Sequence, residues 1–209
     1  MTLDKLRPYV SGFLDPFVHG FDRVGMTPNG VSVLAFAVAI GAALAFMLGG
    51  RADPIWYVVA AVLVFCNGWL DVVDGALARE QGVASPAGDL LDHVLDRYAD
   101  IVIVGGLAAG VGDYFLGFAA VTGVVMTSYL GTQAQAVGLD RVYGGLVGRA
   151  DRLAIIGFVG VLAYPISGTY GGLTLIGWLL VFLAIIGHLT AFQRFFFSWS
   201  ALESSTDEG

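Results

Sequence analysis

Residues 71–96 read DVVDGALAREQGVASPAGDLLDHVLD, and strongly apolar sequence flanks this stretch on both sides. Its acids include Asp71 and Asp74, three residues apart, and Asp92 and Asp96, four residues apart. Both intervals place side chains on one face of an α-helix. Glycine, serine and proline between the two pairs predict a turn. We therefore expect two antiparallel neighbouring helices that bring both pairs of acids to the same depth.

The composition predicts that the flanking apolar sequence crosses a membrane. Of the 209 residues, 57% are hydrophobic and only 13% are charged, and the mean hydropathy is +0.79. A soluble domain is nearer to half apolar and a quarter charged. A helix needs roughly 20 apolar residues to cross the hydrocarbon core of a bilayer. The sequence thus predicts an all-α integral membrane protein with about six transmembrane helices, placed near residues 29–49, 55–78, 89–111, 114–136, 150–169 and 171–194.

The two ends of the chain differ from this apolar middle. Residues 1–28 mix charged and apolar residues, which favours an amphipathic helix lying on the membrane surface. Residues 29–195 form the expected six-helix domain, and residues 196–209 an acidic cytoplasmic tail. Basic residues gather on the side of the termini, while Arg51 falls opposite, so we expect the termini and the acids in the cytoplasm of a multi-pass cell-membrane protein. The side chains expected to face lipid from the first helix are Leu6, Val10, Phe13, Leu14 and Phe17.

The acids within the apolar domain predict a functional site, because charged groups inside a bilayer are costly and rare. Carboxylates at short range repel one another unless cations neutralise them. Oxygen ligands suit hard cations such as Mg²⁺ or Mn²⁺ rather than zinc. We therefore predict a centre of two divalent ions, Mg²⁺ or Mn²⁺. For Asp89 and Asp100, a position at a helix end explains a charge equally well. The predicted metal ligands are Asp71, Asp74, Asp92 and Asp96.

A longer pattern contains these acids. From Asp71 to Asp96 the chain matches D-x-x-D-G-x-x-A-R-x8-G-x-x-x-D-x-x-x-D at every position. This pattern resembles the signature of the CDP-alcohol phosphatidyltransferase family, in particular the branch that makes phosphatidylinositol phosphate or archaetidylinositol phosphate. The resemblance covers most of the chain, since six helices and an N-terminal surface helix are also typical of that family.

The resemblance implies that the protein transfers the lipid phosphate of a CDP-lipid to an alcohol and releases CMP. It assigns Asp96 as the general base that takes the proton of the acceptor hydroxyl, with the two ions over the CDP diphosphate. Small side chains allow a nucleotide close to the helix backbone, and Arg79 offers donors to phosphate oxygens. The expected CDP-lipid-binding residues are Asn29, Gly75, Ala78, Arg79 and Gly88.

Basic residues near the last two predicted helices indicate a phosphorylated acceptor. Arg149, Arg152 and Arg194 resemble the residues that bind the phosphate of inositol phosphate in that branch. Gly131 and Gln133 stand where the branch carries basic residues. Gln133 is therefore expected to bind acceptor hydroxyls, and glycerol phosphate remains an alternative acceptor. An unphosphorylated alcohol such as serine is a third choice.

A divalent-cation transporter is the alternative from another class, because intramembrane acids also line ion pathways. Clustering of the acids at one membrane face argues against it. The expected partners are the CDP-activated lipid, a small polyol phosphate and membrane lipids, with no nucleic acid, and the resemblance implies a homodimer. A net charge of −7 favours a salt-loving archaeon and hence CDP-archaeol, while CDP-diacylglycerol stays open.

Overall fold

The computed structural model describes residues 7–140, 142 and 144–207, and it confirms the all-α class. The only strands in this part of the chain form a short antiparallel hairpin of β1 (Thr169–Tyr170) and β2 (Leu173–Thr174). The helices in the described residues are α1 (Arg7–Arg23), α2 (Pro28–Arg51), α3 (Ile55–Glu80), α4 (Pro86–Val111), α5 (Tyr114–Ala136), α6 (Arg149–Ala163) and α7 (Leu175–Asp207).

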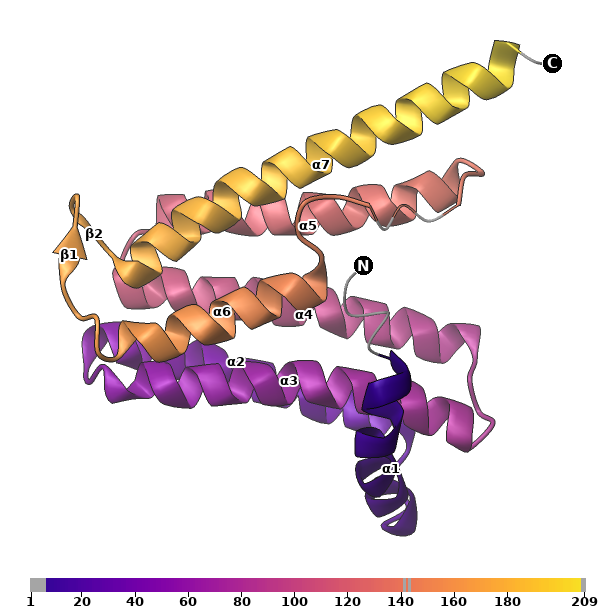
Figure 1. The fold of residues 1–209 in the computed structure, drawn as a ribbon, viewed down its shortest axis with the longest axis horizontal. Coiled ribbons are helices and arrows are strands. Elements are labelled where there is room, and N and C mark those ends of the chain that lie inside the picture. The colour runs from indigo at the N-terminus through magenta and orange to yellow at the C-terminus, as the bar shows by residue number, and fades with distance from the viewer. Residues whose placement is uncertain (1–6, 141, 143, 208–209) are drawn as a thin grey trace.

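Helices α2 to α7 run alongside one another (Figure 1). Helix α1 crosses them at a steep angle, near the start of α2 and the end of α3. Helix α2 packs against α3 and α4, α5 packs against α7, and α6 packs against α3. The β1–β2 hairpin lies at the opposite end of the bundle from the turn that joins α3 to α4. The main core lies between these helices and is built from alanine, valine, leucine and isoleucine side chains.

Four of these helices, α2, α3, α5 and α7, are long and apolar enough to cross a membrane, which identifies a multi-pass membrane protein. The expected number of six is not confirmed. Helix α4 is not among the four, since it carries acids in its first half. Helix α6 is too short, with only 15 residues, because Pro165 follows its end. Helix α7 starts later than expected and continues past residue 194 to Asp207, since no proline or glycine interrupts residues 188–207.

The N-terminal helix α1 packs on the protein through part of its apolar face. Phe17 meets Trp69 of α3 edge to face, with ring centroids 5.3 Å apart. The expectation that Leu14 faces lipid is wrong, because this side chain is buried against α2 and α3. Leu6 and the side chains of Val10 and Phe13 lie outside the described residues. The buried members of this second core are Leu14, Val18, Val31, Val73 and Leu77.

Glycines let α2 and α4 approach backbone to backbone. A Cβ atom built on Gly106 would overlap the carbonyl oxygen of Ala43, and one on Gly110 would lie 2.6 Å from the carbonyl oxygen of Phe46. Small residues of this kind allow close helix packing in membranes. This contact holds α4, which carries Asp92 and Asp96, against α2, which begins beside these acids.

Gly106→Ala should destabilise the protein by about 1–3 kcal/mol, because the added methyl group meets backbone that cannot move aside. Gly105→Ala is the matched control, since no heavy atom lies within 4 Å of a Cβ at Gly105. The control should be neutral or slightly stabilising through helix propensity. Thermal unfolding in detergent measures both variants, and equal unfolding temperatures would contradict the close α2–α4 contact.

Candidate active site

The turn between α3 and α4 brings the acids together as the spacing predicted. Ser85 caps α4, and its hydroxyl accepts a hydrogen bond from the backbone N–H of Gly88 at 3.2 Å. The two helices then run antiparallel, so α3 presents its last acids to the first acids of α4. Carboxylate oxygens of Asp71, Asp92 and Asp96 all lie within 4.8 Å of one another.

The fourth predicted ligand, Asp74, lies beside this group but is held by a neighbour on α2. Its Oδ2 accepts a hydrogen bond from the hydroxyl of Ser32 at 2.6 Å, and its side chain is buried. The four acids line one small cavity of about 10 Å³ between α2, α3 and α4. A volume of this size holds roughly one water molecule. Oxygen ligands around so small a space fit a hard divalent cation.

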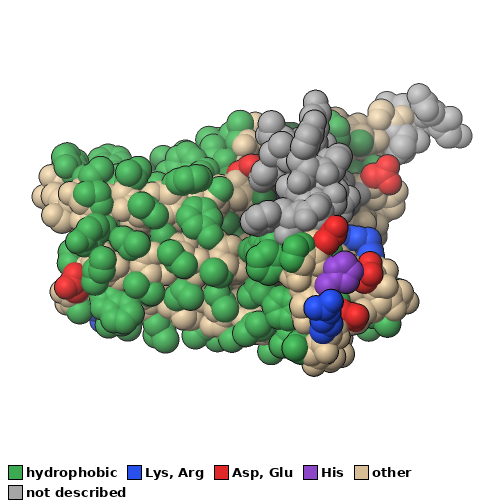
Figure 2. All heavy atoms as spheres, turned by 60° about the horizontal axis from the view of Figure 1, so that its bottom comes forward, with side chains coloured by type: hydrophobic (Ala, Val, Ile, Leu, Met, Phe, Trp, Pro, Cys, Tyr) green, Lys and Arg blue, Asp and Glu red, His purple; other side chains and the backbone are tan. Residues whose placement is uncertain are grey.

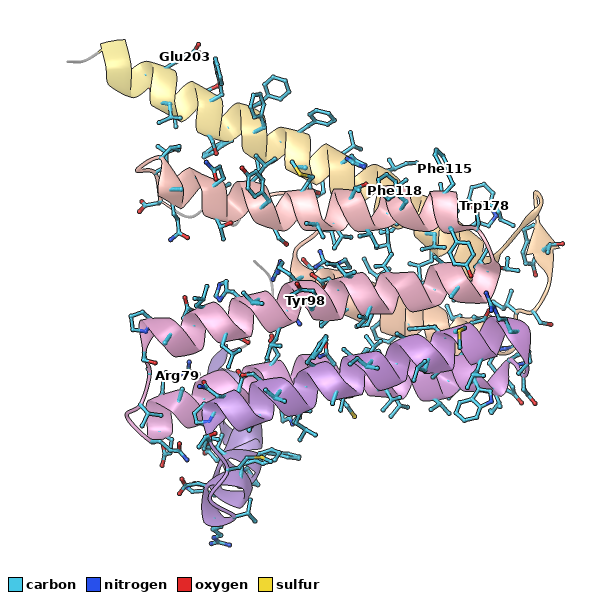
Figure 3. The ribbon with its side chains drawn as sticks, turned by 180° about the vertical axis from the view of Figure 1, so that it is seen from behind. Arg79, Tyr98, Phe115, Phe118, Trp178 and Glu203 are labelled. Carbon is cyan, nitrogen blue, oxygen red and sulfur yellow. The ribbon has the colours of Figure 1, made fainter. Side chains whose placement is uncertain are left out.

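A cavity of about 410 Å³ opens on one side of the acids, between the start of α2, the end of α3 and the start of α4. Asp74 and Asp92 reach it from the acid group. Arg79 lies at this end of the molecule (Figure 3), and its guanidinium has no ion pair with any residue that the structure describes. All the residues expected to bind the CDP-lipid line this cavity, namely Asn29, Gly75, Ala78, Arg79 and Gly88.

A second cavity, of about 700 Å³, opens on the other side of the acids, between α3, α4, α5, α6 and α7. Asp71 and Asp96 reach this one. All three arginines expected to bind the acceptor line it, namely Arg149, Arg152 and Arg194. The acid group therefore separates a cavity with the predicted nucleotide residues from a cavity with the predicted acceptor residues.

Arg149 joins α6 to the acid group. Its guanidinium donates to Oδ2 of Asp71 at 2.7 Å and lies 2.7 Å from Oδ1 of Asp96. One cation thus offsets part of the repulsion between two carboxylates in a site with little solvent. It also ties the acids to the wall of the larger cavity.

Asp100 is an organising residue that sequence reasoning left undecided. Its side chain is only 2% exposed, and Oδ2 accepts from Arg152 at 2.5 Å. Arg149 and Arg97 lie 3.8 Å from its two oxygens. Arg97 also donates to the hydroxyl of Ser128 on α5. The four-residue spacing from Asp96 to Asp100 was the available signal, since it places both on one face of α4.

The remaining predicted acceptor residues have different surroundings. Arg194 donates to the carbonyl oxygens of Gly144 at 2.8 Å and Thr127 at 2.7 Å, and so ties the loop before α6 to α5. A Cβ on Gly131 would lie 2.7 Å from this guanidinium, so the glycine makes room for it. Gln133 is half-buried and lines none of the three cavities described above.

Charged and hydrophobic side chains are unevenly distributed on the surface. Figure 2 shows charged side chains and a histidine gathered at one end of the molecule, while hydrophobic side chains cover most of the rest of that face. The smaller cavity lies beside the turn between α3 and α4, at one end of the bundle (Figure 1). This arrangement suits a site that takes a polar headgroup from a lipid held in the bilayer.

Comparison with known proteins identifies the family. The family model of CDP-alcohol phosphatidyltransferase matches residues 25–192, and the chain belongs to this family. It is thus a transferase, as the resemblance in the acid stretch implied. The alternative of a divalent-cation transporter finds no support among these relatives.

Two curated relatives illustrate the similarity. The chain is 29% identical over 206 residues to the archaetidylinositol phosphate synthase of Methanothermobacter thermautotrophicus, with 96% of each chain covered. It is 32% identical over 195 residues to the phosphatidylinositol phosphate synthase of Mycobacterium marinum, covering 90% of this chain and 80% of the relative.

Solved structures of the phosphatidylinositol phosphate synthase of Mycobacterium tuberculosis share the fold. The complex with manganese and citrate superposes with a TM-score of 0.75 at 25% identity, covering 89% of this chain and 88% of the other. The structure with CDP-DAG bound has a TM-score of 0.74 at the same identity, covering 89% and 93%.

Proposed function

We propose that this protein transfers the lipid phosphate of a CDP-activated lipid to inositol phosphate and releases CMP. The observation that carries the proposal is the acid group between two cavities, one lined by the predicted nucleotide residues and one by basic residues. Both kinds of inositol phosphate synthase named above are similar to this chain over most of its length. The donor is CDP-archaeol or CDP-diacylglycerol.

Two divalent ions, Mg²⁺ or Mn²⁺, would be held by Asp71, Asp74, Asp92 and Asp96, which line the small cavity and also reach the larger cavities on either side of it. When bound, they would stabilise negative charge on the phosphate being transferred and on the leaving CMP. The manganese in the solved relative supports a metal of this kind here. Ser32 fixes the carboxylate of Asp74 through its hydrogen bond and so helps to hold the ligand set in place.

The CDP part of the donor would occupy the smaller cavity. Gly75 and Ala78 leave the surface of α3 flat there, and Arg79 extends an unpaired guanidinium toward phosphate oxygens. The lipid tails would remain among the apolar side chains exposed along the helices. This division leaves the diphosphate beside the acids and the tails in the bilayer.

Asp96 is the residue proposed to accept the proton of the acceptor hydroxyl, because it lies in the acid group and also reaches the larger cavity. The hydroxyl oxygen forms a bond to the lipid-side phosphorus, the anhydride P–O bond breaks, and CMP leaves with the electron pair. Arg149 and Arg152 would orient the phosphate of the acceptor from α6.

Two further proposals concern the setting of the enzyme. Arg23, Arg79 and Arg194 fall on the side expected for the active site, and Arg51 falls at the opposite end, which supports a cytoplasmic active site. A homodimer is proposed from the family resemblance. Gln133 lines none of the three cavities described above, so we leave it out of the residues that would bind the acceptor.

The test is CMP release by the purified protein in lipid, with CDP-archaeol or CDP-diacylglycerol and Mg²⁺ or Mn²⁺. Inositol phosphate, glycerol phosphate and serine are offered separately, with a parallel sample in EDTA. We expect metal-dependent release with inositol phosphate and little with serine. Preference for glycerol phosphate would keep the reaction class but reject the acceptor, and no release with any acceptor would reject the proposal.

A further inference from the structure

A buried asparagine lies next to the acid group and has no role in the reaction described so far. Asn67 is only 1% exposed and lines the small cavity that the four aspartates share. It stands four residues before Asp71 and seven before Asp74, so the three side chains lie on one face of α3. The family pattern begins only at Asp71 and does not include it.

Of the two polar atoms of this amide, only the nitrogen has a hydrogen-bond partner among the described residues. The Nδ2 group donates to the carbonyl oxygen of Ala35 on α2 at 3.0 Å. The Oδ1 atom is buried and has no hydrogen-bond partner among the described residues. Turning the amide over would set two oxygens against each other at Ala35 and is therefore unfavourable.

A hydrogen bond between helices explains the amide nitrogen of Asn67 but not its oxygen. Polar residues often join helices in membranes by such bonds, and the bond from Nδ2 to Ala35 is of that kind. A hydroxyl group would provide the same donor without leaving a second polar atom buried. Buried carbonyl oxygens are nearly always paired, so Oδ1 calls for a partner that the side chains do not supply.

We propose that Oδ1 of Asn67 is a further oxygen ligand of the metal centre, bound to a divalent cation directly or through one water on it. The inference rests on the proposed function, because it requires the cation among the aspartates. A neutral amide oxygen adds coordination without adding to the repulsion among four carboxylates, and hard cations accept such ligands. The bond to Ala35 holds the oxygen in place.

The experiment measures Mn²⁺ binding directly, from the electron paramagnetic resonance signal of free Mn²⁺ over the purified full-length protein without substrates. Asn67→Leu removes the oxygen and keeps the branching of the side chain. Asn67→Asp keeps an oxygen and loses the donor to Ala35. Cys66→Ala is the control, because this neighbour on α3 is exposed and belongs to no site described here.

We expect Asn67→Leu to weaken Mn²⁺ binding about tenfold or more, while the control binds as tightly as the wild type. Asn67→Asp should weaken binding less than the leucine variant, because it keeps a ligand oxygen but loses the bond to Ala35. If the leucine variant does not fold, Asn67→Ala takes its place. Unchanged binding by the folded leucine or alanine variant would overturn the assignment of Asn67, as would equal weakening in the leucine and aspartate variants. A wild-type protein that binds no Mn²⁺ would reject the metal centre itself and the inference with it.

Discussion

Asp96→Asn is expected to lower the rate of CMP release about 10³-fold, the largest effect of any single substitution proposed for this protein. The amide cannot accept the proton of the acceptor hydroxyl, and it is a weaker ligand for a hard cation. Asparagine has nearly the same size, and its oxygen can still accept from Arg149, which lies 2.7 Å from Asp96. The fold should therefore survive the change.

The matched control is Asp53→Asn, at the opposite end of the bundle. There Oδ1 of Asp53 accepts from the backbone N–H of Ile55 at 2.9 Å, and asparagine keeps this cap. Initial rates with saturating CDP-lipid and inositol phosphate measure both variants, and thermal unfolding confirms that they are folded. Retention of more than about a tenth of the wild-type rate by Asp96→Asn would remove it as the general base.

Asp100→Asn is expected to cost about 3 kcal/mol of stability, because it removes one charge of a buried ion pair. Arg152 is only 4% exposed and would keep a positive charge without its main counterion. The change should also raise KM for inositol phosphate more than KM for CDP-lipid. Asp100 orients the arginines of the larger cavity and does not reach the smaller one.

Thermal unfolding and the two KM values measure this variant against Asp15→Asn, an exposed acid on α1. The control should stay within about 0.5 kcal/mol of the wild type. If Asp100→Asn lost stability but raised both KM values equally, its role would be structural and not specific to the acceptor. Wild-type stability would instead contradict the buried pair.

The α3–α4 hairpin and its acids were predictable because the information is local. The spacing of Asp71 and Asp74 defines a helix face, the glycine and proline between the pairs define a turn, and short turns make neighbours antiparallel. The structure accordingly brings Asp71, Asp92 and Asp96 together. Most residues of the family pattern then line one cavity from both sides of the turn, namely Asp74, Gly75, Ala78, Arg79, Gly88 and Asp92.

The contacts of α6 and α7 were not predictable in the same way. Arg149 stands 78 residues after Asp71 in the sequence, yet the two are paired at 2.7 Å. Positive charge near a helix end suits either a phosphate ligand or an anchor at lipid headgroups. Arg194 illustrates the ambiguity, since it lines the larger cavity while its guanidinium binds two backbone carbonyls.

The membrane class, the paired helices and the acid pattern could be predicted from local sequence, because apolar length and helical period act within one segment. Three features became visible only in the folded protein: Asp100 pairs with arginines, Asn67 lines the acid cavity, and the acids separate two cavities. These features depend on which faces of α2, α4, α5, α6 and α7 meet. Side-chain packing between distant segments sets those faces, and no local pattern encodes them.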